Sequence, residues 1–145
     1  MKDLHSSCRV TLAIGAAVLA ADNTPAAVDL QGYSSAELVL AIGIGGITFD
    51  ASNKIEFKVT DSDDNSTYAA VETADMLGVT IASDGIVKSL VAAHAAAAVY
   101  RFGYVGGKRY VKVLADFTGT HGTGTPIAAT WVLGHAQDGP VAAQA

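Results

Sequence analysis

Polar and apolar residues alternate at every position from Lys54 to Thr60 (KIEFKVT). Successive side chains of a β-strand point to opposite faces, so this pattern predicts a strand with one face in water and the other in the core. The next residues, Asp61 to Ser66 (DSDDNS), are of types that bond their own backbone in turns. We therefore expect the chain to reverse there and Thr67 to Val71 to return as an antiparallel partner strand.

Five more segments are rich in apolar, β-branched and aromatic residues, as expected of strands. Two of them, which are followed by Gly43 and Gly134, show little polar alternation and are expected to be more deeply buried. The five expected strands are Cys8–Ile14, Ala36–Ile42, Tyr100–Tyr104, Tyr110–Leu114 and Ile127–Leu133.

The segments between the strands suggest three kinds of connection. Val105 to Arg109 (VGGKR) is expected to be a hairpin turn, because its two glycines can supply positive φ. Gly119 to Gly124 (GTHGTG) is expected to be a surface loop. The Ala-rich segment Leu90 to Val99 has the highest helix propensity in the chain, but aromatic and β-branched residues that favour a strand follow it, so at most a helix of one or two turns is expected there.

The whole sequence predicts one all-β domain. Its 145 residues are enough for a single core, and its 27 Ala and 15 Gly favour thin packed layers. We expect a single-domain antiparallel β-sandwich, jelly-roll-like, of about eight short strands and at most one short helix. Residues 1–7 are expected to form a flexible N-terminal arm, and residues 8–145 the sandwich.

The net charge and the length of the longest apolar run limit the kinds of partner that this protein is expected to bind. The net charge of −5 has the wrong sign for a phosphate backbone, so we expect no nucleic acid. The apolar run Val10 to Ala21 is too short for a membrane span of about 20 residues, so we expect no membrane partner. The same run resembles a secretory signal, which leaves a processed, secreted protein as an alternative. The single Cys8 either packs as a small apolar residue or links two chains.

The turn after Lys54 to Thr60 has the spacing of a calcium-binding loop, carried by Asp61, Asp63, Asn65 and Glu72. A calcium loop requires Gly at the sharp bend, where this chain has Ser66, and a helix on each side. A strand is expected before this turn instead. A solvated acidic turn is therefore our preferred interpretation, and a calcium site is the alternative.

The sequence contains no motif for metal binding by histidines, for nucleophilic catalysis or for nucleotide binding. The four histidines, His5, His94, His121 and His135, have no metal-ligand spacing. Neither a nucleophile elbow, nor a phosphate-binding loop, nor a dinucleotide fingerprint is found. We expect a protein that is not an enzyme and has no catalytic, cofactor or metal site.

Several segments of the chain carry a family resemblance: Ala20–Asp22, Ala27–Tyr33, Tyr100–Val113, Gly134–His135 and Gly139–Ala142. Together they resemble the small structural proteins, encoded near the capsid genes of tailed bacteriophages, that decorate or cement the head. The likeness runs in order over most of the chain, and the YVGGKRYV segment carries most of its specificity.

The resemblance implies a β-sandwich on the outer surface of the capsid in the virion, assembled in the host cytoplasm. The implied partner is the major capsid protein, and a second copy of the chain is a further candidate. An unpaired N-terminus can add a strand to a neighbour's edge, and basic residues lie near Tyr104 and Tyr110. The expected capsid contacts are Lys2, Leu4, His5, Lys108 and Arg109.

Two alternatives to capsid decoration remain. The protein is a neck, tail or spike-base component of the same virion, or it is a secreted bacterial β-sandwich binding module with a cleaved signal peptide and calcium in the Asp61 turn. The number of copies per virion separates the first alternative from decoration, and processing of the N-terminus identifies the second.

Overall fold

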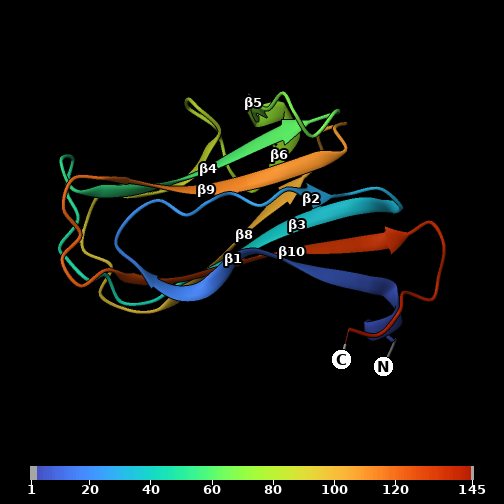
Figure 1. The fold of residues 1–145 in the computed structure, drawn as a ribbon, viewed down its shortest axis with the longest axis horizontal. Coiled ribbons are helices and arrows are strands. Elements are labelled where there is room, and N and C mark those ends of the chain that lie inside the picture. The colour runs from blue at the N-terminus through green and yellow to red at the C-terminus, as the bar shows by residue number, and fades with distance from the viewer. Residues whose placement is uncertain (1–2, 145) are drawn as a thin grey trace.

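Two antiparallel sheets pack face to face over residues 3–144, the part of the chain that this computed structural model describes (Figure 1). Sheet A contains, in spatial order, β1 (Cys8–Leu19), β10 (Thr125–Ala136), β3 (Tyr33–Ile42), β8 (Ala98–Tyr104) and β6 (Met76–Leu77). Sheet B contains β2 (Val28–Asp29), β9 (Tyr110–Thr118), β4 (Lys54–Ser62) and β5 (Ala69–Ala70), and β7 (Ile86–Leu90) also pairs with β4. The short 3₁₀-helices are η1 (His5–Ser7) and η2 (Thr73–Asp75).

The strand pairing is that of one long hairpin rolled into two layers. β1 pairs with β10, β2 with β9, β3 with β8 and β4 with β7, all antiparallel. β10 also pairs with β3 in sheet A, and β9 pairs with β4 in sheet B, so the strand pairs are joined into two continuous sheets. This is jelly-roll topology. The prediction of a jelly-roll-like antiparallel β-sandwich of about eight strands is confirmed, and the two-residue strands β5 and β6 are added to the roll.

The core lies between the sheets, where alternate residues of facing strands meet. Ile55, Phe57 and Val59 of β4 are fully buried, which confirms the alternation seen from Lys54 to Thr60. Trp131 of β10 is also fully buried. No described helix is long and apolar enough to cross a membrane.

The predicted hairpin at residues 105–109 is wrong. Tyr100–Tyr104 lies in β8 of sheet A and Tyr110–Leu114 in β9 of sheet B, so residues 105–109 form an arch between the sheets. Gly106 and Gly107 do not have positive φ. Gly106 has a different role, because a Cβ there would lie 2.5 Å from the hydroxyl oxygen of Tyr104.

The segment Leu90 to Val99, for which at most a short helix was expected, contains no helix. Residues 91–97 carry the chain from β7 in sheet B to β8 in sheet A without a helical turn. His94 anchors this connection: its Nδ1 lies 2.8 Å from the carbonyl oxygen of Gly43, and its own carbonyl accepts from the Gly45 amide at 2.9 Å. Contacts with another loop thus outweigh the helix propensity of alanine.

The N-terminal strand is longer and more exposed than predicted. β1 runs to Leu19, and of the expected buried strand Cys8–Ile14 only Ala13 and Ile14 are buried, because β1 is the edge of sheet A. Of the predicted arm, residues 3–7 include η1, where the Ser6 carbonyl accepts from the Val141 amide at 3.0 Å. The two ends of the described chain therefore lie side by side (Figure 1).

Candidate interaction surfaces

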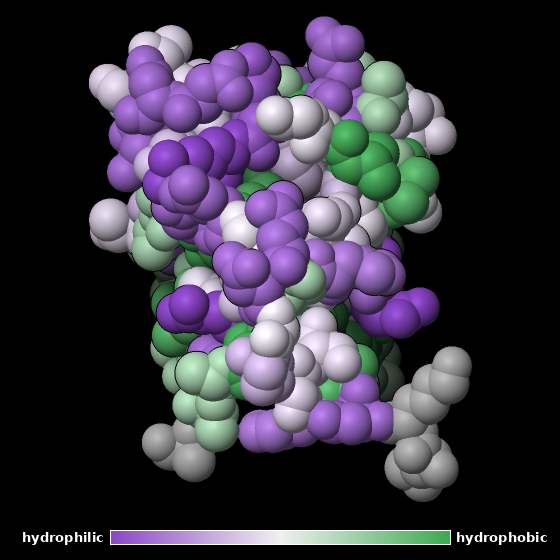
Figure 2. Space-filling model, turned by 90° about the vertical axis from the view of Figure 1, so that its right-hand side faces the viewer, coloured by the Kyte–Doolittle hydropathy of each residue, from purple (hydrophilic) through white to green (hydrophobic). Residues whose placement is uncertain are grey.

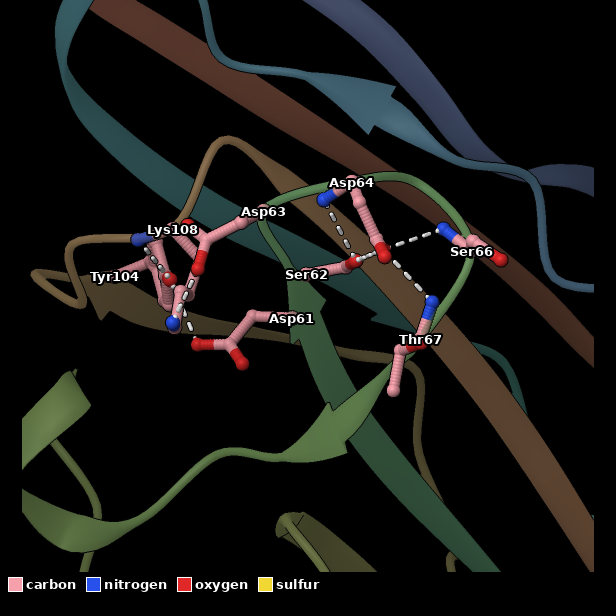
Figure 3. A network of polar contacts seen from close by, with 8 residues as sticks. All are labelled: Asp61, Ser62, Asp63, Asp64, Ser66, Thr67, Tyr104 and Lys108. Atoms are coloured by element: carbon pink, nitrogen blue, oxygen red, sulfur yellow. Dashed lines mark hydrogen bonds and ion pairs between the residues drawn. The ribbon is translucent and has the colours of Figure 1, made fainter.

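The turn after β4 is organised around the carboxylate of Asp64 (Figure 3). Its Oδ1 accepts from the backbone amides of Thr67 and Ser66 and from the hydroxyl of Ser62, each at 2.8 Å. These donors favour the charged carboxylate, and the amides of Thr67 and Ser66, with the Ser62 hydroxyl, lower the pKa of Asp64 to about 2. The predicted acidic turn is thus held by its own backbone.

Beside this turn, Tyr104 reaches across from β8 to the carboxylate of Asp61 (Figure 3). The Tyr104 hydroxyl donates to Asp61 Oδ2 at 2.8 Å, and both residues are buried. The same hydroxyl accepts from the Lys108 amide at 3.2 Å. Burial, together with the neighbouring Asp61 carboxylate, raises the pKa of Tyr104. This contact joins sheet B, the arch and sheet A at one end of the sandwich.

The four residues with calcium-loop spacing point to separate partners. Asp61 accepts from Tyr104, Asp63 pairs with Lys108, and Asn65 accepts from the Tyr68 hydroxyl. Glu72 immediately precedes η2 and forms a reciprocal capping box with Asp75. Within residues 3–144, no three His, Cys, Asp or Glu side chains form a group that could hold a metal ion.

The basic residues of the arch form ion pairs within the chain. Lys108 pairs with Asp63, which raises the pKa of Lys108. Arg109 donates to Asp29 through Nε at 2.9 Å and through Nη2 at 2.7 Å, and this fork-like contact lowers the pKa of Asp29. These two cations are therefore exposed but already have acidic partners.

The expected capsid contacts lie at one end of the sandwich, which we call the Asp-turn end. It consists of residues 3–7, 30–34, 62–67, 105–109 and 137–140, and Figure 2 looks onto it. Leu4 is 71% exposed there, His5 begins η1, and Lys108 and Arg109 lie on the arch. Lys2 lies outside the described residues. Hydrophilic residues cover most of this end (Figure 2).

The outward face of sheet B is charged, and its charges are paired. Lys54 Nζ lies 2.8 Å from Glu56 Oε1, and Lys58 Nζ lies 2.6 Å from Asp116 Oδ2. The Asp116 carboxylate raises the pKa of Lys58. Lys112 lies over the Tyr68 ring at 3.8 Å from its centroid. This face has the composition of an ordinary solvated protein surface.

The outward face of sheet A is different, because it is mostly apolar and exposed; at one end it is bordered by η1 and the preceding Leu4, which lines a hollow with Glu37 and Arg101. Leu12, Val18, Leu77 and Val99 are 60%, 61%, 58% and 64% exposed, respectively. We call this surface the outer apolar face. Its residues are Val10, Leu12, Val18, Glu37, Val39, Ala41, Leu77, Val99, Arg101, Gly103, Pro126, Ala128, Thr130 and Val132.

The register places these side chains in rows across the sheet. One row runs Val10, Val132, Glu37, Gly103, Leu77, and the next runs Leu12, Thr130, Val39, Arg101. The charged residues of the face are Glu37 and Arg101, which lie on neighbouring strands with Arg101 Nε 3.5 Å from Glu37 Oε1. Contiguous apolar patches of this extent are rare on soluble monomers and indicate a surface that binds another protein.

This face was not predicted from the sequence. The strands Ala36–Ile42 and Ile127–Leu133 were expected to be more deeply buried than the others because they show little polar alternation. In the structure their inward residues are buried, whereas their outward residues are partly exposed. A strand that is apolar on both sides can face a binding partner as well as a core. The low polarity of these two strands was therefore the sequence feature that could have indicated the outer apolar face.

The chain was compared with protein-family models, curated proteins and solved structures. None of these comparisons gives a match.

Proposed function

We propose that this protein is a structural component of a tailed-bacteriophage virion that binds the outer surface of the capsid and stabilises the shell. The observation that carries the proposal is the grouping of the expected contacts. Leu4 and His5 are about a hundred positions from Lys108 and Arg109 in the sequence, yet all four lie at the Asp-turn end. One contact with the shell can therefore engage both segments at once.

The form of the molecule supports a role in binding. The sandwich presents broad sheet faces, and the arch and the turn at the Asp-turn end are fixed by the contacts of Tyr104 and Asp64. Ordered side chains lose less conformational entropy on binding. Many copies of such a contact on a symmetric lattice resist detachment together even when each contact is weak.

Among the alternatives, removal of a signal peptide conflicts with the position of β1. Loss of the first twenty or so residues would delete β1, which pairs with β10 over most of its length and contributes Ala13 and Ile14 to the core. The backbone groups of β10 would lose these partners. A neck, tail or spike-base role agrees with the same surface, and only the number of copies per virion separates it from decoration.

Two matched variants test the capsid contact. Leu4→Glu places a charge at the Asp-turn end, whereas Val91→Glu places it on the connection after β7, at the opposite end of the slab; the two side chains are 71% and 52% exposed. We expect purified heads to carry the wild-type chain in stoichiometric amounts, Val91→Glu to bind equally, and Leu4→Glu to bind at least about tenfold more weakly. Heads that carry none of the chain would refute the proposal.

A further inference from the structure

We propose that the outer apolar face is the interface of a two-fold symmetric homodimer, in which the same face of a second copy covers it. This inference concerns the free protein and is tested without capsids, although Leu4 of the Asp-turn end borders the outer apolar face, where it lines one hollow with Glu37 and Arg101. It follows from the size of the face, from its two charges and from the edge of β1.

The size of the face is that of a stable interface. Five strands about 4.8 Å apart span about 19 Å, and the six steps from Pro126 to Val132 span about 20 Å. The strand framework of the face is therefore roughly 380 Å² in area, and the side chains that project from its surface and margins raise the accessible area toward the roughly 800 Å² per partner of a standard interface. Sheets packed face to face lie about 10 Å apart, so the outward side chains of two copies can interdigitate.

The charges of the face make it complementary to itself. Glu37 of β3 and Arg101 of β8 lie near the middle of sheet A, and their side chains are 37% and 69% exposed. A two-fold axis between the two sheets that passes over the midpoint of this pair, perpendicular to the line from Glu37 to Arg101, places Glu37 of each copy opposite Arg101 of the other. The result is a ring of four alternating charges enclosed by apolar side chains, with no like charges directly opposed.

The net charge of the chain favours this face for self-association. Two copies of a chain with net charge −5 repel each other in most orientations. The outer apolar face contributes one charge of each sign, so its approach to a second copy brings no excess of either sign together. Burial of the apolar side chains supplies the attraction.

The free edge of β1 is a poor alternative route to a dimer. The pairing of β1 with β10 is irregular between Leu12 and Ile14 and between Ile14 and Ala17. Such irregularities twist an edge away from an incoming strand. At Val10 the edge is occupied by Gln144, whose side-chain amide bonds both backbone groups of that residue. Face-to-face packing needs none of these backbone groups.

A charge exchange tests the interface in the purified full-length chain. Sedimentation equilibrium of the wild type is expected to show a dimer. Arg101→Glu places four carboxylates together in a dimer, and Glu37→Arg places four guanidinium groups together, so each is expected to raise the dimer dissociation constant at least about tenfold. The double variant Glu37→Arg, Arg101→Glu restores alternation and is expected to dimerise within about threefold of the wild type. Because the double variant also restores the Glu37–Arg101 pair within each chain, unchanged urea midpoints of the two single variants are needed to exclude misfolding as the cause.

A second pair of variants tests the apolar part. Val99→Glu, on the face, is expected to give a monomer, whereas Val105→Glu, on the arch, is expected to leave the dimer intact; the wild-type side chains are 64% and 54% exposed. A wild-type monomer at about 100 µM, a trimer, or a dimer unaffected by Val99→Glu would overturn the proposal. A monomer that loses capsid binding on Val99→Glu would assign the face to the capsid instead.

Discussion

The side-chain amide of Gln144 makes both backbone hydrogen bonds that Val10 offers on the free edge of β1. The Val10 amide donates to Gln144 Oε1 at 2.9 Å, and Gln144 Nε2 donates to the Val10 carbonyl at 2.9 Å. In this way one side chain replaces a paired strand at an open edge. Asn23 does the same on the side of β9 that the two-residue strand β2 leaves unpaired, where its side-chain amide bonds the Val113 carbonyl and the Ala115 amide.

Removal of Gln144 is expected to expose this edge locally. In Gln144→Ala the Val10 amide loses its acceptor, and a net hydrogen bond of about 1 kcal/mol corresponds to about fivefold faster hydrogen exchange. Exchange measured by NMR or mass spectrometry checks this at Val10. The control is Gln137→Ala, because Gln137 is bound through its backbone amide to the Gly32 carbonyl. Equal Val10 exchange in the two variants would contradict the role of Gln144.

The two glycines of the arch are expected to differ in their tolerance of alanine. A Cβ at Gly106 meets the Tyr104 ring at 2.5–2.6 Å, whereas a Cβ at Gly107 meets nothing within 4 Å. Gly106→Ala must displace Tyr104 and is expected to cost about 1–3 kcal/mol. Gly107→Ala is expected to change the free energy of unfolding by less than about 1 kcal/mol. Denaturant unfolding of both variants measures the difference, and similar values would show that the arch relaxes freely.

The hydrogen bond between Tyr104 and Asp61 is expected to contribute measurably to stability. Tyr104→Phe keeps the ring but leaves the buried Asp61 carboxylate without this donor, which typically costs about 1–3 kcal/mol. Tyr110→Phe removes a hydroxyl from a half-buried residue at the start of β9 and is expected to cost less than about 0.5 kcal/mol. Urea unfolding compares the two, and equal losses would exclude a special role for the buried pair.

The Asp64 turn is expected to weaken in acid. The pKa of Asp64 in the folded protein is about 2, below the ordinary value of 3.8, so the folded state favours the carboxylate. The resulting stabilisation is complete above about pH 5 and is lost as the pH falls through about 2. Asp64→Asn lacks this titration. The difference between its urea midpoint and that of the wild type is therefore expected to shrink from pH 6 to pH 2.5.

A charge control accompanies this experiment. Asp138→Asn removes one negative charge from an exposed position in the C-terminal tail. If the difference in urea midpoint between the wild type and Asp64→Asn stays constant across the pH range, the hydrogen bonds from the backbone amides of Ser66 and Thr67 do not depend on the charge of Asp64.

The parts of the fold that were predictable are those encoded locally. The alternation from Lys54 to Thr60 defined β4 and its buried face, and DSDDNS defined the turn, because both depend only on neighbouring residues. The partner of a strand is not local information. Tyr100–Tyr104 and Tyr110–Leu114 adjoin a glycine-rich turn as a hairpin does, yet each pairs with strands distant in the sequence.

The interaction surfaces were only partly predictable for a related reason. The basic residues of the arch were visible in the sequence, but their acidic partners, Asp29 and Asp63, come from other segments. The outer apolar face depends on which side of sheet A is left uncovered. Val39 and Leu40 are adjacent apolar residues, and only the packing of the sheets decides which of them is buried.

The place of β10 in sheet A has a consequence for biosynthesis. β10 lies between β1 and β3, but it is the last of the described strands to leave the ribosome. Until then, β1 has no neighbour in its sheet, and one side of β3 is open. Nascent chains therefore carry unfinished, apolar strands throughout translation, and an early stop before Thr125 would release a product prone to aggregate.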